Sequence, residues 1–399
     1  MKDKKIIVGV TGGIAAYKAA ELVRILVKAG AEVRVAMTAN ATRFISPLTL
    51  ETLSGNKVIS DMFNSETHPI AHITWGQESD LVIIAPATAN FIAKMAHGIA
   101  DDFLSTMVLA STAKILVCPS MNSRMLLNPV TQENIKRIVE RGCMVMDPRE
   151  GELACHTEGP GRLPDPEEIA EQARIMLTEQ DLSGLRVLVT AGPTIEQIDP
   201  VRYISNRSTG KMGYALARAA AMRGASVTLI SGPTALIPPR GVKFRGVKSA
   251  EEMREAVFDC LGDSDVIIKA AAVSDYRPRD RSARKIKKGA DSLSIDLVKN
   301  PDILSELGKD KADYGYILVG FAAETEDILT NATKKLRDKN LDIIVVNDIT
   351  REDAGFESDT NLVKIIHEDG SREELPLMSK DEVAGQVLDR IKALRENGI

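Results

Sequence analysis

Several features that mark specialised classes of protein are missing from this chain of 399 residues. None of its apolar runs reaches the roughly 18 residues that a membrane-spanning helix needs, and no signal-peptide pattern precedes the first apolar segment. The net charge of −5 lacks the basic excess that is typical of general nucleic-acid binders. We therefore expect a cytoplasmic protein whose partners include neither a membrane nor a nucleic acid.

Cysteine is scarce and scattered. The four cysteines, Cys118, Cys143, Cys155 and Cys260, form no CxxC pair, so neither a zinc site nor a disulfide framework is indicated. Cys118 and Cys143 lie in apolar runs and are expected in the core, whereas Cys155 lies among glycines and polar residues. A thiol in such a loop can serve as an acid or a nucleophile, and an exposed thiol without a function is the open alternative.

Two common nucleotide-binding motifs are also absent. The turn at residues 11–16 lacks the GxGxxG spacing, and the second predicted strand ends at Thr38 rather than at an acid that could hold a ribose. The glycine–lysine pair at Gly210 is followed by Met212, and no glycine stands five residues earlier, which excludes Walker A. A mononucleotide such as FMN fits the first turn better than a dinucleotide, and a tight turn without a ligand is the open alternative.

What the chain does contain is the alternating pattern of an α/β protein. Its length favours two or three domains, and its 44% apolar and 27% charged residues are ordinary for a globular protein. Short β-branched runs between helical stretches predict two doubly wound, Rossmann-like domains with mainly parallel sheets. The pattern lapses at residues 179–184, so we place one domain at 1–178, a linker at 179–184 and the second domain at 185–399.

Each half opens with a strand, a glycine turn and a helix start. Residues 6–10 lead into TGGIAAYK, and residues 187–190 lead through a long connection to STGKMG at 208–213. Each opening can aim free backbone N–H groups and a helix N-terminus at an anion. The doubling therefore predicts two nucleotide-dependent active sites on one chain.

The strand ends locate the residues that can contact ligands, because ligands of such sheets bind beyond the carboxyl ends of the strands. In the first half we expect the loops at 11–16, 38–42, 86–90 and 119–125 to face one crevice. In the second half the connection at 191–207 carries several apolar residues, which favours an ordered binding loop over a disordered one.

Single residues in these segments leave alternatives open. His72 stands four residues after His68, but no third ligand has suitable spacing, so a structural or surface histidine competes with a functional one. Asn122 follows a strand end, where its amide could hold a carboxylate. Four cations within residues 284–288 are either a solvated charged face or part of a phosphate-binding site.

Longer motifs resemble a known family. In the first half GVTGGIAAYK, APATAN, PSMNSRM and CHTEGPGR follow one another as in homo-oligomeric flavin-containing cysteine decarboxylases. In the second half AGPTIEQIDPVRYISNRSTGKMG, AAVSDY, KIKK, VKNPDI and GFAAET follow the order of phosphopantothenate–cysteine ligases. Together the chain resembles the bacterial and archaeal bifunctional coenzyme A biosynthesis proteins over nearly all of its length.

For the first half, the resemblance implies a flavodoxin-like domain that uses FMN to decarboxylate 4′-phospho-N-pantothenoylcysteine to 4′-phosphopantetheine, with FMN oxidising the substrate thiol. His72 matches the catalytic histidine, Asn122 the asparagine that grips the substrate carboxylate, and Cys155 the proton donor on a mobile flap. Gly13 stands where many relatives have Ser, a departure that removes no catalytic group. The expected FMN contacts are Gly12, Gly13, Thr38, Thr88 and Asn90.

For the second half, the resemblance implies that the carboxylate of 4′-phosphopantothenate attacks the α-phosphate of CTP and that L-cysteine then captures the acyl-cytidylate. Mg²⁺ or Mn²⁺ would neutralise the developing charge, and no metal ligand is predicted. Asn206 matches the residue that holds the acyl-cytidylate, and Lys285 matches the catalytic lysine, which also contacts CTP. The other matched CTP contacts are Asp275, Pro301, Asp302, Ile303, Leu304, Phe321, Lys335 and Lys339.

The resemblance also implies a homo-oligomer, in which flavoprotein halves form trimers with FMN between subunits and ligase halves form dimers. Both contacts together would give a dodecamer. Two alternatives to a bifunctional enzyme stay open. A nicotinamide-dependent oxidoreductase would share the α/β pattern, but the missing GxGxxG counts against it. A non-catalytic regulatory subunit would be expected to have lost His72, Cys155 or Lys285, and all three are present.

Overall fold

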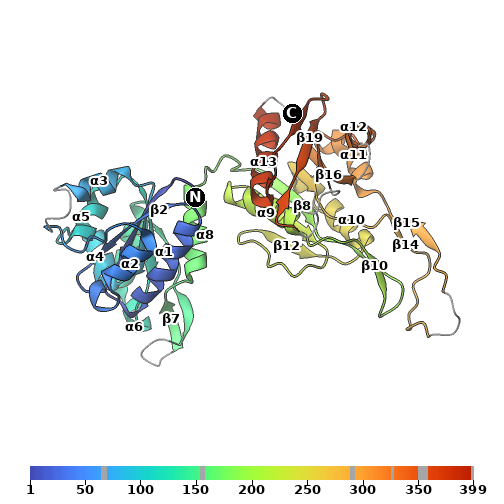
Figure 1. Ribbon diagram of the computed structural model, residues 1–399. Helices are drawn as coiled ribbons and strands as arrows, with labels where there is room; N and C mark the ends of the chain where they lie inside the picture. The colour runs from blue at the N-terminus through green and yellow to red at the C-terminus, as the bar shows by residue number, and fades with distance from the viewer. Residues whose placement is uncertain (64–69, 153–157, 288–292, 325–327, 349–357, 397–399) are drawn as a thin grey trace. The chain divides into compact units, whose positions relative to one another are not determined.

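The computed structural model describes residues 1–63, 70–152, 158–287, 293–324, 328–348 and 358–396. It contains two compact units, Met1–Glu179 and Gln180–Ile399 (Figure 1). Each unit has its own central sheet covered by helices on both faces. Within the described part of the chain, no helix combines the length and the apolar character that crossing a bilayer requires.

The first unit is built on a five-stranded parallel sheet in the order β2-β1-β3-β4-β5. The strands are β1 (Lys5–Val10), β2 (Glu32–Met37), β3 (Leu81–Ala87), β4 (Lys114–Pro119) and β5 (Met144–Val145). The next strand in the chain, β2, lies on one side of β1, whereas β3 lies on the other side, so the strand order reverses between β1 and β3. This is the flavodoxin-like arrangement, whose ligand crevice lies beyond the carboxyl ends at the reversal.

Helices cover both faces of this sheet because its strands alternate apolar side chains between them. Ile6 and Val8 pack with Leu22 on one face, while Ile7 packs with Phe91 on the other. The first face carries α1 (Lys18–Lys28), α2 (Pro47–Ser54) and α8 (Pro166–Leu177). The second carries α3 (Ala71–Glu78), α4 (Ala89–His97), α5 (Phe103–Ala110) and α7 (Pro129–Glu140).

The second unit has an eight-stranded sheet in the order β12-β11-β8-β13-β16-β17-β19-β20. The strands are β8 (Arg186–Ala191), β11 (Ser226–Ser231), β12 (Lys243–Gly246), β13 (Val266–Lys269), β16 (Ile317–Glu324), β17 (Ile343–Asp348), β19 (Val363–His367) and β20 (Arg372–Glu374). The first six in the sheet order run parallel, and β19 and β20 add an antiparallel edge. The order reverses between β8 and β13, which predicts a ligand crevice there.

Among the described residues, five helices cover the two faces of this second sheet. One face packs against α9 (Lys211–Met222) and α13 (Lys380–Glu396), and the other against α10 (Ala250–Phe258), α11 (Ile303–Tyr314) and α12 (Ile328–Asp338). Two antiparallel hairpins stand outside the sheet in the described residues (Figure 1): β9 (Ile195–Gln197) with β10 (Tyr203–Ser205), and β14 (Tyr276–Pro278) with β15 (Leu297–Lys299). A third antiparallel pair joins β18 (Thr360–Asn361) to β21 (Met378–Ser379).

The expected fold class, two doubly wound α/β domains with mainly parallel sheets, is confirmed. The long connection after β8 is ordered as expected, and it holds the β9–β10 hairpin. The first α-helix begins at Lys18, because residues Ile14–Tyr17 form a 3₁₀ turn after the glycines. This short turn brings the helix start closer to the strand end than a longer loop would.

Candidate functional site

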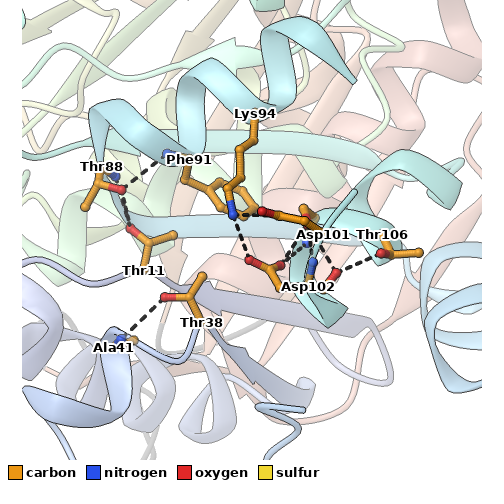
Figure 2. Close-up of polar contacts among 10 residues, drawn as sticks. Thr11, Thr38, Ala41, Thr88, Phe91, Lys94, Asp101, Asp102 and Thr106 are labelled. Carbon is orange, nitrogen blue, oxygen red and sulfur yellow. Dashed lines mark hydrogen bonds and ion pairs between the residues drawn. The ribbon is translucent and has the colours of Figure 1, made fainter. Parts of the chain in front are cut away.

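The first candidate site lies at the reversal between β1 and β3, where threonines join the two strand ends. The Thr11 hydroxyl donates to the Pro86 carbonyl oxygen at 2.7 Å and accepts from the Thr88 amide at 3.0 Å. Thr88 in turn caps α4, because its hydroxyl accepts from the Phe91 amide at 3.4 Å (Figure 2). These contacts hold the loops after β1 and β3 in one fixed arrangement.

The two glycines after β1 have different structural requirements. A Cβ on Gly12 would lie 2.4 Å from the Asn40 Cβ, so packing against the loop after β2 requires glycine here. In that loop the Thr38 hydroxyl accepts from the Ala41 amide at 3.4 Å (Figure 2). A Cβ on Gly13 would meet only the Thr88 Cγ2, at 3.4 Å, and its φ of −130° suits any residue. Close packing therefore requires glycine at position 12 but not at position 13.

A cavity of about 510 Å³ opens beside these loops, within the roughly 300–1,000 Å³ typical of small-molecule sites. We call it the flavin cavity, after the cofactor that the resemblance implies for this unit; its lining includes the expected residues Gly12, Gly13 and Thr88. Two other expected contacts are placed elsewhere. Thr38 lies in the loop after β2, Asn90 is exposed in the first turn of α4, and neither is part of the described lining.

Asn122 and His72 lie differently with respect to the flavin cavity. Asn122 lines it and caps the short helix α6 (Ser123–Leu126), its Oδ1 accepting from the Arg124 amide at 2.9 Å. His72 is the second residue of α3 and is not part of the described lining. The single chain therefore brings Asn122, but not His72, to the cavity.

An antiparallel hairpin of β6 (Arg149–Glu152) and β7 (Glu158–Arg162) borders the flavin cavity. The Met121 amide donates to the Gly161 carbonyl oxygen at 3.0 Å. A Cβ on Gly161 would lie 2.1 Å from the Met121 carbonyl oxygen, so this approach requires glycine. Cys155 falls between the two strands, outside the described residues. The hairpin thus fixes the two ends of the segment that carries the expected proton donor.

The other two cysteines of this unit, Cys118 and Cys143, pack among apolar side chains. Cys118 is fully buried on β4, and burial raises the pKa of its thiol. Cys143 is half-buried, and burial raises its pKa as well, against the opposing charge of Arg141. Both thiols are therefore poor nucleophiles.

The second candidate site lies at the reversal between β8 and β13, where glycines bring α9 onto the strand end. Gly192 and Gly210 have φ angles of +71° and +78°, which favour glycine. A Cβ on Gly213 would lie 2.5 Å from the Ala191 Cβ. The α9 N-terminus, whose cap residue Gly210 offers no side chain, therefore presents its free backbone N–H groups at this edge.

Two adjoining cavities lie beyond these strand ends. The helix cavity, of about 300 Å³, is lined by residues 208–213 at the start of α9 together with Asn206 and Lys335. The strand cavity, of about 490 Å³, is lined by the end of β13 and the start of α11. The expected nucleotide contacts Pro301, Asp302, Ile303, Leu304 and Lys339 line the strand cavity, and Asp275 and Phe321 line both. Nearly all residues matched to CTP therefore meet at one edge of the sheet.

Lys285 differs from this group. It is exposed in the segment that follows β14, and it lines neither cavity. The next residue is anchored, because the Ile286 amide donates to the Asp199 Oδ2 at 3.2 Å. The structure therefore fixes the backbone beside Lys285 without bringing its side chain to the two cavities.

The strand cavity contains charged groups of both signs. Burial opposes ionisation of Asp302, but its ion pair with Lys339 at 2.9 Å and its cap of α11 together lower its pKa. Lys269, at the end of β13, also lines this cavity and was not expected from the sequence. Burial lowers the pKa of Lys269 to about 8. The only sequence signal for it was a lysine at the end of an apolar strand.

A resident metal has no evident ligand set in the part of the chain that the structure describes. Among those residues, no group of three or more His, Cys, Asp or Glu side chains is placed to hold an ion.

Known proteins resemble both units. Residues 1–177 match the family model described as flavoprotein, and residues 182–394 match that of the DNA/pantothenate metabolism flavoprotein C-terminal domain. The coenzyme A biosynthesis bifunctional protein CoaBC of Bacillus subtilis (strain 168) is 48% identical over 399 residues, which covers 99% of this chain and 98% of the relative. The protein of the same name from Escherichia coli (strain K12) is 45% identical over 396 residues, covering 98% and 97%. A crystal structure of a CoaBC C-terminal domain is 45% identical and covers 55% of this chain and 100% of its own, with a TM-score of 0.47.

Proposed function

The chain belongs to the family of coenzyme A biosynthesis bifunctional proteins, and we propose that its two reactions take place at the two strand-order reversals described above. It is an enzyme that combines phosphopantothenate–cysteine ligase and phosphopantothenoylcysteine decarboxylase activities. The observation that carries the assignment of sites is that each unit has its own cavity at its own reversal, lined by its own motif residues. The ligase unit makes the substrate that the decarboxylase unit consumes.

In the first unit, the flavin cavity suits FMN in size and in its glycine turn. Gly12, Gly13 and Thr88 would hold the cofactor, which would accept two electrons from the thiol of 4′-phospho-N-pantothenoylcysteine and return them after CO₂ has left. Asn122 holds the substrate carboxylate at the cavity wall, which orients the bond that releases CO₂. Cys155, between β6 and β7, then delivers a proton to the decarboxylated carbon.

We also propose that the flavoprotein halves assemble as trimers with FMN between subunits. Three apolar residues that line the flavin cavity support a subunit contact there, because Ile14, Tyr17 and Met125 are 60%, 61% and 50% exposed. A neighbouring copy would also account for His72, the proposed catalytic histidine, which does not line the cavity of its own chain. Light scattering coupled to gel filtration measures the mass, and a monomer would contradict the assembly.

The ligase halves would form dimers through the two hairpins outside the sheet, and with the trimers these contacts would give a dodecamer. Exposed apolar side chains on the hairpins support this, namely Tyr203 on β10, Tyr276 on β14 and Leu297 on β15. Lys285 lies in the segment between β14 and β15 and lines neither cavity of its own chain, so a dimer contact is also the simplest route to its proposed catalytic role.

In the second unit, CTP would occupy the strand cavity and the adjoining helix cavity. The carboxylate of 4′-phosphopantothenate attacks the α-phosphate, pyrophosphate leaves, and the amine of L-cysteine displaces CMP from the acyl-cytidylate. The N–H groups at the start of α9 and the ammonium groups of Lys335 and Lys339 stabilise the anionic transition state, and Asn206 holds the acyl-cytidylate. Mg²⁺ or Mn²⁺ would enter with the triphosphate as its counter-ion.

One reaction mixture tests both halves. The full chain, incubated with 4′-phosphopantothenate, L-cysteine, CTP and Mg²⁺, is expected to produce 4′-phosphopantetheine by mass spectrometry, and the purified protein should be yellow and release FMN. Colourless protein that binds NADPH instead would contradict the assignment. We propose a cytoplasmic location, which the unpaired thiols of Cys118, Cys143 and Cys260 support.

A further inference from the structure

Lys269 occupies an unusual position for a lysine. It ends β13, between β8 and β16 in the middle of the eight-stranded sheet, and its residue is only 8% exposed. Among the residues that the structure describes, its ammonium group has neither a hydrogen bond nor an ion pair. What remains accessible of Lys269 borders the strand cavity.

An unpaired buried charge is costly, and the same unit contains a lysine that avoids the cost. The Lys311 ammonium lies 2.6 Å from the Asp342 carboxylate, which is itself 1% exposed. A buried ammonium that has no such partner gains most from an anion that arrives as a ligand.

A second buried polar group borders the same cavity. Ser274 is 4% exposed, and its hydroxyl has no hydrogen-bond partner among the described residues. Its backbone is fixed, because its amide donates to the Thr194 Oγ1 at 3.0 Å and its carbonyl oxygen accepts from the Asn300 Nδ2 at 2.8 Å. The strand cavity is therefore bordered by two buried residues, from separate positions in the chain, whose side-chain donors have no acceptor among the described residues.

The other charges around Lys269 do not provide that acceptor. Asp302 and Asp275 attract it and Lys339 repels it, but Asp302 is already paired with Lys339 at 2.9 Å. Lys299, on β15, adds a further cation to the lining. With three lysines and two aspartates, the cavity has a positive excess that suits an anionic ligand.

We propose that Lys269, together with Ser274, binds a phosphate oxygen of the nucleoside triphosphate in the strand cavity. This inference rests on the proposed ligase function, and it deepens it by naming two residues of this cavity that contact the triphosphate. Among the parts of a nucleotide, only the phosphates supply an anionic oxygen, whereas the base and the ribose offer neutral groups. A charged hydrogen bond from a buried ammonium is of the stronger kind.

The buried position also predicts how binding depends on pH. In the empty protein the pKa of Lys269 is about 8, and a bound phosphate raises it. Below that pKa the lysine is already charged. Above it, binding must take up a proton, so the affinity for the triphosphate falls as the pH rises until the pKa of the complex is reached.

The test compares CTP, pyrophosphate and cytidine by calorimetric titration of the full FMN-loaded chain, in wild type and in K269M, K269R and S274A. K269M should weaken CTP and pyrophosphate at least about tenfold, lose the pH dependence above pH 8 and leave cytidine unchanged. K269R should recover most of the CTP affinity, and S274A should weaken CTP by a smaller factor. K309M is the matched control, because Lys309 is exposed on α11 and lines neither cavity.

Three results would overturn the proposal. An equal loss for cytidine would mean that Lys269 contacts the base or the ribose. Unchanged CTP affinity in K269M and S274A would remove both residues from the site. A wild-type chain that fails to bind CTP at all would refute the nucleotide site itself, which separates the failure of the proposed function from that of Lys269. The unfolding temperature and the FMN content establish that each variant is folded.

Discussion

The side-chain amide nitrogen of Asn206 donates to the backbone carbonyl oxygen of Ala272 at 3.2 Å. The same nitrogen donates to the Val273 carbonyl oxygen, also at 3.2 Å. Asn206 lies just before α9, and the two carbonyls lie just after β13, so these bonds join the two sides of the strand-order reversal in the ligase unit. Both acceptors are backbone oxygens, and therefore only a donor fits between them.

N206D should abolish ligation and leave decarboxylation intact. A carboxylate at this position would face two carbonyl oxygens, and the loop that carries the residue would lose its attachment beside the helix cavity. We expect ligase turnover to fall by about a hundredfold or more, as for the loss of one preorganised donor. The measurement is CMP release with CTP, cysteine and 4′-phosphopantothenate, compared with CO₂ release from supplied 4′-phospho-N-pantothenoylcysteine. Loss of both activities in a folded, yellow protein would disprove the division of labour.

C155S should separate decarboxylation from completion of the product. A serine hydroxyl is a far weaker acid than a thiol, so CO₂ is still released but the decarboxylated carbon is not protonated at a useful rate. Mass spectrometry should then detect an oxidised, decarboxylated product that is two hydrogens lighter than 4′-phosphopantetheine. C118S, at a buried position away from the described cavity lining, is the control for loss of a thiol. Full turnover by C155S would reject the proton-donor role.

G12S and G13S should differ sharply although they are adjacent. A Cβ on Gly12 would lie 2.4 Å from the Asn40 Cβ and 3.0 Å from the Asn40 carbonyl carbon, so the loops must separate at a cost of about 1–3 kcal/mol. A Cβ on Gly13 makes only an ordinary contact with Thr88. The ratio of flavin to protein absorbance should therefore drop in G12S and stay near the wild-type value in G13S. Equal flavin content in the two would contradict the packing argument.

D181N should destabilise the ligase unit in a pH-dependent way. Hydrogen bonds from Arg223 hold the pKa of Asp181 at about 2, and Lys392 adds an ion pair at 3.1 Å. Because the pKa is lowered in the folded state, the carboxylate contributes its stability above its unfolded pKa of about 4, and this is lost as the pH falls toward 2. We expect D181N to lower the free energy of unfolding by about 2 kcal/mol at neutral pH, with the difference shrinking in acid.

Calorimetric unfolding of the full chain measures this difference. The control is D389N, because Asp389 also pairs with Arg223, at 2.7 Å, but is 52% exposed and should contribute under about 1 kcal/mol. If D389N costs as much as D181N, burial is not what makes the Asp181 pair stabilising.

The sequence predicted the sheets and the sheet edges at which the cavities lie, for a physical reason. β-branched runs such as those of β1 and β8 are buried on both faces, and the glycines after them mark sharp turns with little room for a Cβ. The hairpin of β6 and β7 was not predicted, because its strands carry glycines and charges. Contacts far apart in the chain stabilise it, such as that from Met121 to Gly161.

The placement of single side chains was harder to predict. Asn90 follows a strand end as Thr88 does, but the first turn of α4 directs it to solvent. Lys269 was not predicted as a site residue, since a lysine at the end of a strand is usually solvated. Its burial depends on neighbouring strands and on the loops around the strand cavity, which periodicity along one strand does not report.

The hydroxyl of Thr11 joins the Pro86 carbonyl oxygen and the Thr88 amide through bonds made within one chain. We therefore expect the two strand ends beside the proposed flavin site to keep their arrangement when the cofactor is removed. Protein from which FMN has been removed should then keep its helical content, and added FMN should restore the yellow colour without a refolding step.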